Sequence, residues 1–156
     1  MAAAVTNRQR RVPVSVPRIR RAAQRALTAV GRPGATIDVD IVDDREIARL
    51  NTEHRGIRRR TDVLAFPLEL ADAPSPLIGQ VVVSADTARR QSRRLGVALA
   101  LELDLLVTHG VLHVIGYDDR DPMEATLMHR REREILTTAR FPPPARLWAG
   151  LLHASR

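Results

Sequence analysis

The sequence predicts an α+β fold, close to α/β in its alternation, with a small mixed sheet of about four strands covered by helices. Stretches that are continuously apolar, or that alternate between apolar and polar residues, are typical of strands and lie at 3–6, 36–42, 63–66 and 78–84. Elsewhere, apolar residues recur at the three- and four-residue spacing of helices. Short strands followed by longer helices therefore indicate a sheet with helices packed on it.

The length of the chain indicates one domain. Its 156 residues can bury roughly 70% of the surface that the unfolded chain would expose, so no cross-link is needed. We interpret residues 1–156 as a single domain and 141–156 as its C-terminal tail. Apolar residues at 147, 148, 151 and 152 predict a short helix in this tail, which docks on the domain or contacts a partner.

The positive charge is concentrated at the N-terminus. Residues 1–37 contain eight arginines and no acid, whereas the other seventeen arginines are balanced by eighteen acids, which gives the formal net charge of +7. All 25 basic residues are arginine, whose planar fork can grip phosphate in a bidentate way. The distribution is compatible with binding to a polyanion such as RNA, but charge alone does not identify the partner.

Two absences narrow the chemistry. The chain has no cysteine, which excludes disulfides, thiolate zinc sites and a cysteine nucleophile. Any metal site must use nitrogen and oxygen ligands. Glu102 and Asp104 interrupt the one long apolar stretch, so no segment is apolar enough to span a membrane. We expect a soluble, cytoplasmic protein with no membrane partner.

The first half of the chain predicts a strand, a helix, a second strand and a second helix. An arginine-rich segment with an apolar stripe ends at Gly31, as an amphipathic helix does. The strand at 36–42 follows, and Asp43 or Asp44 caps a short helix through Asn51. The arginines of the first helix form a solvated face or contact RNA; those that we assign to RNA are Arg18, Arg21 and Arg25.

The second half continues with two strands joined by a proline-containing loop. Arginines at 59 and 60 precede the strand at 63–66 and make an exposed loop suited to phosphate, so Arg59 and Arg60 are further candidates for RNA binding. A helix at 86–95 carries a basic ridge. Later, Asp121 is followed by proline and has glutamate three positions on, which predicts a capped helix to about residue 138.

Between these elements lies a long helix that carries two histidines. His109 and His113 are four residues apart, so their side chains share one helix face about 6 Å apart along the axis and can bind one divalent metal. Gly116 allows the left-handed backbone that ends a helix, so the chain can fold back. Asp119, or alternatively Asp118, then becomes the third ligand. The competing interpretation is that both histidines are hydrogen-bonded core residues without a metal.

The segment HGVLHVIGYDD, residues 109–119, resembles the signature of the YbeY family. That family comprises bacterial rRNA maturation factors and single-strand endoribonucleases, in which HGxLHLxGYDH supplies three histidine zinc ligands. The resemblance implies a zinc site made by His109, His113 and residue 119, with Asp119 in place of the third histidine. It also implies a zincin-like arrangement in which the buried metal-bearing helix lies across the sheet.

Other segments extend the resemblance over most of the chain. LNTEHR, residues 50–55, is similar to the family's LNxxxR, which implies that Arg55 points into the active site. TDVLAFP, residues 61–67, is similar to a strand that lies beside the metal in the family. In this chain Arg60 replaces a proline, Ala65 a serine and Gln80 an acid, departures that affect the loop and the surroundings of the metal.

These observations favour a metal-dependent phosphodiesterase. Gly110 stands where peptidases of the HExxH type keep their glutamate base, which argues against a peptidase. Catalysis would rest on a metal-activated water and on an arginine that stabilises developing charge. Our catalytic candidates are Arg55 and His109, with metal ligands His109, His113 and Asp119. We expect one Zn²⁺ per chain; because Asp119 is a carboxylate, Mn²⁺ or another divalent metal is an alternative.

The resemblance implies a function in RNA processing. It implies a single-strand-specific endoribonuclease in 16S rRNA 3′-end maturation and ribosome quality control. Its partners would be rRNA or other single-stranded RNA and ribosomal or small-subunit proteins. Two alternatives remain: a ribosome-assembly or RNA-binding factor with a structural metal and no catalysis, and a metallohydrolase of another substrate.

Overall fold

The computed structural model describes residues 3–56, 61–68, 76–138 and 142–149. Its sheet has the strand order β1-β2-β4-β3. Strand β4 pairs with β2 in parallel and with β3 in antiparallel orientation, and β1 is parallel to β2. The predicted small mixed sheet is thereby confirmed. The strands are β1 (Ala3–Asn7), β2 (Thr36–Val42), β3 (Val63–Pro67) and β4 (Leu77–Ser84).

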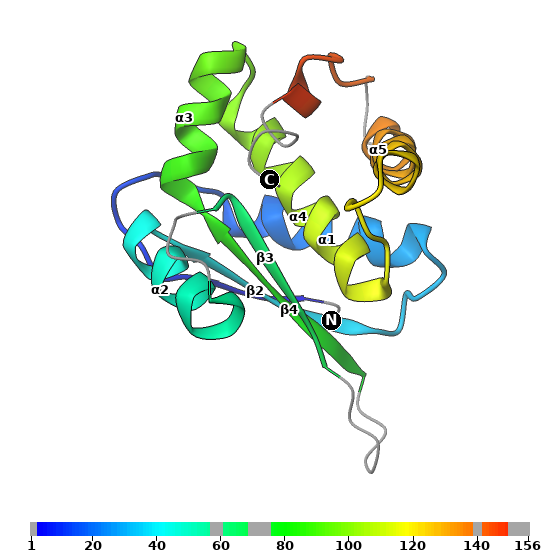
Figure 1. The fold of residues 1–156 in the computed structure, drawn as a ribbon, viewed down its shortest axis with the longest axis horizontal. Helices are drawn as coiled ribbons and strands as arrows, with labels where there is room; N and C mark the ends of the chain where they lie inside the picture. Colours follow the sequence, from blue (N-terminus) through cyan, green and yellow to red (C-terminus); the bar gives the residue numbers. More distant parts are fainter. Residues whose placement is uncertain (1–2, 57–60, 69–75, 139–141, 150–156) are drawn as a thin grey trace.

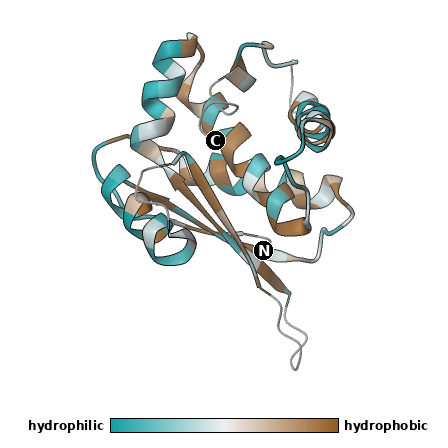
Figure 2. Ribbon diagram, in the orientation of Figure 1, coloured by the Kyte–Doolittle hydropathy of each residue, from teal (hydrophilic) through white to brown (hydrophobic). Residues whose placement is uncertain are grey.

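Helices cover both faces of the sheet (Figure 1). Helix α4 crosses one face and packs against α1, α3 and α5, while α2 lies on the opposite face. Figure 2 shows hydrophobic residues along the strands and α4, and mostly hydrophilic residues on α2 and α3. The helices are α1 (Val16–Ala29), α2 (Asp44–Arg55), α3 (Ala85–Leu95), α4 (Leu99–Ile115) and α5 (Pro122–Thr137).

Capping residues explain where the helices begin and end. The side chain of Asp43 accepts a hydrogen bond from the Glu46 amide at 2.9 Å and so begins α2. Asp121 does the same for α5 through the Met123 amide at 2.7 Å, as its sequence context predicts. Helix α2 continues past Asn51, where the sequence analysis ended it, because the left-handed residue that stops it is Gly56 (φ 70°).

Strand alternation produces a core on each side of the sheet. Val81 and Val83 of β4 face α4 and belong to the larger core, whereas Val82 faces the other way and packs with Ile47 of α2. All three valines are almost completely buried. Because β4 is covered on both faces, its apolar run is continuous rather than alternating.

Two glycines bring α4 close to the sheet. A Cβ atom at Gly110 of α4 would lie 2.5 Å from a methyl of Val81, and one at Gly79 of β4 would lie 2.6 Å from a methyl of Val114. The backbone of α4 therefore packs on a side chain of β4 at Gly110, and the backbone of β4 packs on a side chain of α4 at Gly79. Since Gly110 adjoins His109, this close packing fixes where the histidine face of α4 lies.

The part of the tail that the structure describes packs on the domain. This is the first of the two alternatives predicted for it, the other being contact with a partner. Leu147 is fully buried and Trp148 is 4% exposed, and both belong to the larger core. The other two apolar tail residues, Leu151 and Leu152, lie outside the described residues. Among the helices described, none is long and apolar enough to cross a membrane.

Candidate metal centre

Two imidazoles converge on the buried face of α4. Nε2 of His113 lies 2.9 Å from Nε2 of His109, an approach that helical spacing of four residues allows. The His109 side chain is 2% exposed and that of His113 is 26% exposed. The pair therefore sits at the edge of the core, with His109 inside and His113 nearer to solvent.

The hydrogen bonds at Nδ1 of each histidine determine which ring nitrogen is available to bind a metal. Nδ1 of His113 faces the carbonyl oxygen of Tyr117 at 3.0 Å, and a carbonyl only accepts, so this nitrogen carries a proton. Nδ1 of His109 faces a carboxylate oxygen of Glu132 at 2.6 Å. In the neutral tautomer both Nε2 atoms then present lone pairs to one another. A cation between them, a proton or a metal ion, offsets their repulsion.

The turn after α4 brings a carboxylate to the same point. Gly116 ends the helix with φ 118°, and Oδ2 of Asp119 then lies 3.6 Å from Nε2 of both His109 and His113. Asp118 instead stabilises the turn, since its Oδ1 accepts hydrogen bonds from the amides of Asp119 at 2.7 Å and Arg120 at 3.1 Å. Of the two aspartates left open by the sequence, Asp119 is the one whose carboxylate lies near both histidines, whereas Asp118 binds the backbone of the turn.

The three donor atoms fit a divalent metal. Given their separations of 2.9, 3.6 and 3.6 Å, the point equidistant from all three lies about 2.0 Å from each, which matches usual Zn–N and Zn–O bond lengths. The site also attracts positive charge. Burial alone would lower the pKa of His113, but its hydrogen bond to Asp119 and the charge of Asp119 outweigh burial and raise that pKa. Two imidazoles and a carboxylate are a donor set suited to zinc or a somewhat harder metal.

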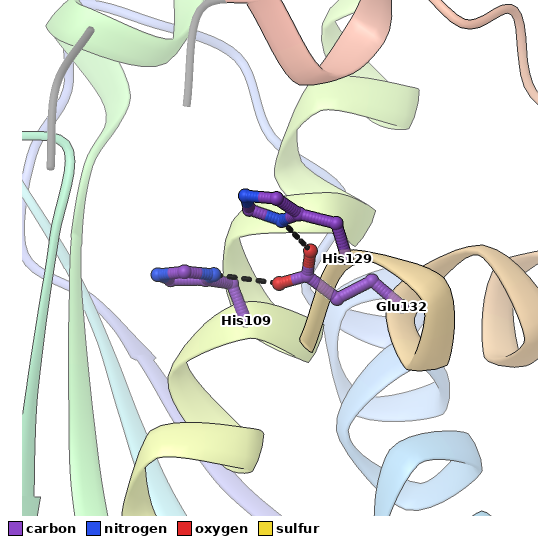
Figure 3. A group of neighbouring side chains, drawn as sticks. All are labelled: His109, His129 and Glu132. Carbon is purple, nitrogen blue, oxygen red and sulfur yellow. Dashed lines mark hydrogen bonds and ion pairs between the residues drawn. The ribbon is translucent and has the colours of Figure 1, made fainter. Parts of the chain in front are cut away.

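Glu132 of α5 is the hydrogen-bond centre behind the site. Its carboxylate lies between the rings of His109 and His129, as Figure 3 shows. Nδ1 of His129 is 2.7 Å from Oε1, and Nε1 of Trp148 donates to the same oxygen at 3.0 Å. Burial would raise the pKa of Glu132, but the charge of His109 and the hydrogen bonds from both histidines outweigh burial and lower it. When His109 is neutral, an ionised, fully buried Glu132 keeps its one ring proton on Nδ1 and leaves Nε2 free.

The second group of possible ligands, His109, His129 and Glu132, has donor atoms within 4.8 Å of one another. Its short contacts are hydrogen bonds through the two Nδ1 atoms. A metal here would have to displace those protons and make His109 bridge two cations. We interpret this group as support for the first site. His129 lies in a charged stretch of α5 but is only 16% exposed, because its ring turns towards Glu132.

Comparisons with known proteins agree with this geometry. The family model described as Endoribonuclease YbeY matches residues 4–140. The chain belongs to this family. A relative from Geobacter metallireducens, named Endoribonuclease YbeY, is 39% identical over 140 residues, which cover 86% of this chain and 93% of the relative. One of the same name from Anaeromyxobacter sp. (strain Fw109-5) is 45% identical over 118 residues, 76% of this chain but only 62% of the relative.

The YbeY resemblance inferred from the HGVLHVIGYDD segment is thus confirmed. A solution structure from Thermotoga maritima is 21% identical, covers 97% of this chain and 92% of its own, and superposes with a TM-score of 0.60. At that identity it shows the fold alone. The family model ends at residue 140, so the Trp148 contact with Glu132 comes from a segment beyond the YbeY match.

The arginines singled out in the sequence lie in different places. Arg55 is the last residue of α2, while its side chain, like the whole of Arg59 and Arg60, lies outside the described residues. On α1, Arg18 is bound to Asp104 of α4 at 2.7 Å, Arg21 is exposed and Arg25 is half-buried. Arg18 therefore ties α1 to the helix that bears the histidines, whereas Arg21 is open to solvent.

The sequence did not identify two buried carboxyls, Glu102 on α4 and Asp62 just before β3, as buried groups. Glu102 is fully buried, and neither of its oxygens has a hydrogen-bond partner among the described residues. Burial, and secondarily the charge of Asp62, raises its pKa to about 8. Burial also raises the pKa of Asp62, just before β3, to about 6, although the charge of His109 opposes it. Only the interruption of an apolar run at Glu102 could have signalled this pair.

Proposed function

We propose that this protein is a metal-dependent endoribonuclease that cuts single-stranded RNA and acts in 16S rRNA 3′-end maturation and ribosome quality control. Two things support the proposal: membership of the family described as Endoribonuclease YbeY, and the three donor atoms of His109, His113 and Asp119. The observation that carries it is the mutual spacing of those atoms, which matches a divalent cation. Zn²⁺ is the expected ion, and the carboxylate makes Mn²⁺ a reasonable alternative.

The residues of the chain have distinct roles in this proposal. A divalent metal, when bound, supplies Lewis acidity that polarises a phosphoryl oxygen and lowers the pKa of water. His109, His113 and Asp119 hold it, and Glu132 keeps the proton of His109 on Nδ1. Arg55, at the end of α2, is the proposed catalytic arginine that meets the negative charge developing on the phosphate.

The close packing of Gly110 argues against a peptidase of the HExxH type. A Cβ at this position would already collide with Val81 and approach Val63 at 3.3 Å. A glutamate side chain has no room there, so this site has no general base in the position that those peptidases use. Hydrolysis of a phosphodiester, which metal and arginine can promote without such a base, suits the site better.

The test compares metal content with RNA cleavage in the same preparations. Elemental analysis of the wild type should give about one metal per chain, a content reduced in Asp119→Ala and lost in His113→Ala. A labelled single-stranded RNA should be cut by the wild type and by Asp38→Asn, which removes a carboxylate from β2. Cleavage should fall with metal content and also in Arg55→Ala, whose metal content should stay normal. If Arg55→Ala supports normal cleavage, or if metal-free protein cuts RNA at the full rate, the proposed mechanism is wrong.

A further inference from the structure

A second polar site lies at the end of the sheet where the parallel strands finish. It is a pocket of about 500 Å³ at the junctions of β2 with α2 and of β4 with α3. It shares no residue with the metal centre. Its lining residues are Arg11, Asp43, Asp44, Arg45, Asp86, Arg89, Arg90 and Arg93.

The three aspartates of the pocket are already engaged by the protein itself. Asp43 caps α2. Oδ1 of Asp44 accepts hydrogen bonds from Ser84 and Thr87, and its Oδ2 pairs with Arg90 at 2.8 Å. Asp86 accepts a hydrogen bond from the Asp44 amide at 3.0 Å. These carboxylates brace the junction of α2 with α3. Among the pocket arginines, all of which lie in the described part of the chain, Arg90 is the one that forms an ion pair with them.

The other four arginines, which we call the arginine group, are Arg11, Arg45, Arg89 and Arg93. None of them forms an ion pair with any residue in the described part of the chain. They come from three separate segments, namely the loop after β1, the first turn of α2, and α3. Unpaired guanidinium groups that share a cavity repel one another, and an anion removes that cost.

Phosphate is the anion that this arrangement suits best. Guanidinium groups bind phosphate oxygens through paired N–H donors. The N-termini of α2 and α3 both open here, and their dipoles add to the positive potential. The free N–H groups contribute less, because Asp43, Asp86 and Ser84 already accept from the first turns. Recognition therefore rests on the arginine group.

The pocket and the metal centre lie at different levels along β4. Gly110 of α4 packs at the level of Val81, and Val114 at the level of Gly79, so α4 runs antiparallel to β4. The metal-site residues after His109 therefore lie towards the start of β4, while the pocket lies beyond Ser84. Three residues of strand separate Val81 from Ser84, roughly 10 Å. A ligand that touches both sites must be extended, as the linked phosphates of a nucleic-acid strand are.

We propose that the arginine group binds phosphate groups of an RNA strand whose scissile bond lies at the metal centre. This inference rests on the proposed endoribonuclease function and adds to it a substrate-binding site outside the metal centre. It requires that a long single strand contact both sites and a very short one reach only the metal centre. The pocket thereby sets affinity for longer RNA and leaves the cleavage chemistry to the metal centre.

The experiment uses Arg45→Gln/Arg93→Gln in the full chain. Both residues are exposed, so the double variant should fold, which circular dichroism checks. The control is Arg32→Gln, an exposed arginine in the loop before β2, at the opposite end of that strand from the pocket. Binding to a labelled single-stranded RNA of about twenty nucleotides is measured by fluorescence anisotropy with a chelator present, over a range of salt concentrations.

The double variant should bind this RNA about tenfold more weakly, and its log–log salt slope should be shallower by about 1.4, since each phosphate contact on a single strand contributes about 0.7. Arg32→Gln should keep the wild-type slope. With metal restored, the double variant should cut a very short RNA at the wild-type rate and the long RNA at a lower kcat/KM.

An unchanged salt slope, or an equal loss in Arg32→Gln, would overturn the inference. The inference would also be wrong if the double variant bound RNA as the wild type does but no longer bound poly-glutamate. The pocket would then be a contact for an acidic protein. Failure of the proposed function gives a different pattern: no chelator-sensitive cleavage by the wild type, whatever the arginine variants do. Weaker, less salt-dependent RNA binding by the double variant would then still support a phosphate site.

Discussion

Glu132 and His109 are joined by a 2.6 Å hydrogen bond between helices α5 and α4. Both side chains are buried, with exposures of 0% and 2%. The carboxylate stands on the opposite side of the imidazole from Nε2, the nitrogen that faces His113 and Asp119. The proposed ligand is therefore oriented by a residue 23 positions away in the sequence.

Glu132→Gln should weaken metal binding without removing a ligand. A neutral amide offers one acceptor oxygen where the carboxylate receives three N–H groups, so at least one donor loses its partner. We expect metal affinity to fall about 10–100-fold, as is usual when such a supporting group is lost. Competition with a chromogenic chelator measures it. Glu134→Gln, on the exposed face of the same helix, is the control and should bind as the wild type does. Equal affinity in the two variants would show that Glu132 does not orient His109.

Trp148→Phe should reveal the contribution of the tail. The change keeps an aromatic ring in the core but removes the N–H that lies 3.0 Å from Glu132. One buried hydrogen bond to a charged acceptor contributes about 1.5–3 kcal/mol, so the free energy of unfolding should fall by about that amount. The imidazole nitrogen shifts of His109 in the metal-free protein should also change, which a purely packing role would not produce. If the nitrogen shifts of His109 do not change, Trp148 contributes through packing alone.

How far the sequence could predict this site depends on which contacts are local. The pairing of His109 with His113 follows from helix geometry, and the return of the chain at Gly116 follows from the conformational freedom of glycine. The support from Glu132 and Trp148 could not be predicted, because both contacts depend on how α4, α5 and the tail pack together. The burial of His129 could not be predicted either, because a charged neighbourhood does not show which face of a helix meets another helix.

The strands and helices could be predicted from the sequence more fully than the residues that hydrogen-bond to the candidate ligands. Strand β2 has the predicted bounds, because alternation around Ile37, Val39 and Ile41 is a local pattern. The end of α2 was not predicted correctly. No residue near Asn51 marks an end of the helix, and the residue that stops it is Gly56. Gly110 was noticed for the glutamate that it replaces, whereas its contact with Val81 depends on the distance between α4 and β4.

Gly110→Ala should destabilise the fold. Its added methyl would lie 2.5 and 2.9 Å from the two methyls of Val81, so helix and strand must separate. Overpacking of this kind costs about 1–3 kcal/mol, which urea denaturation can measure. Gly34→Ala is the matched control, because its new Cβ meets nothing within 4 Å. The control should be neutral or slightly stabilising. Equal stability of both variants would mean that α4 does not pack this closely.

Asp119→His should shift the metal preference of the site. The change introduces the imidazole that the family signature implies at this position and removes a hard, charged oxygen ligand. We expect the ratio of zinc to manganese affinity to rise by about tenfold or more, about 1.4 kcal/mol. Asp118→His, one residue earlier in the turn, should leave the ratio unchanged because Asp118 binds backbone amides. Titration of each metal-free variant with both ions decides it; an unchanged ratio in Asp119→His would exclude Asp119 as a ligand.

Glu102 should make the stability of the protein depend on pH. Burial, then the charge of Asp62, raises its pKa from 4.5 to about 8. Between these values the folded chain keeps a proton that the unfolded chain has released, so the folded state binds more protons and the free energy of unfolding falls as pH rises. The slope attributable to Glu102 approaches about −1.4 kcal/mol per pH unit within that window.

Glu102→Gln isolates this effect, because Asp62 and His113 also titrate with raised pKa values and act in the same direction. Urea denaturation at several values between about pH 5 and pH 8 should give a steeper decline for the wild type than for the variant, and parallel curves above about pH 9. The amide leaves the burial of the site unchanged but cannot ionise, so the difference between the two curves reports Glu102 alone. Parallel curves over the whole range would show that Glu102 releases its proton near pH 4.5 in the folded protein. Its carboxylate would then have to be solvated or paired despite its burial.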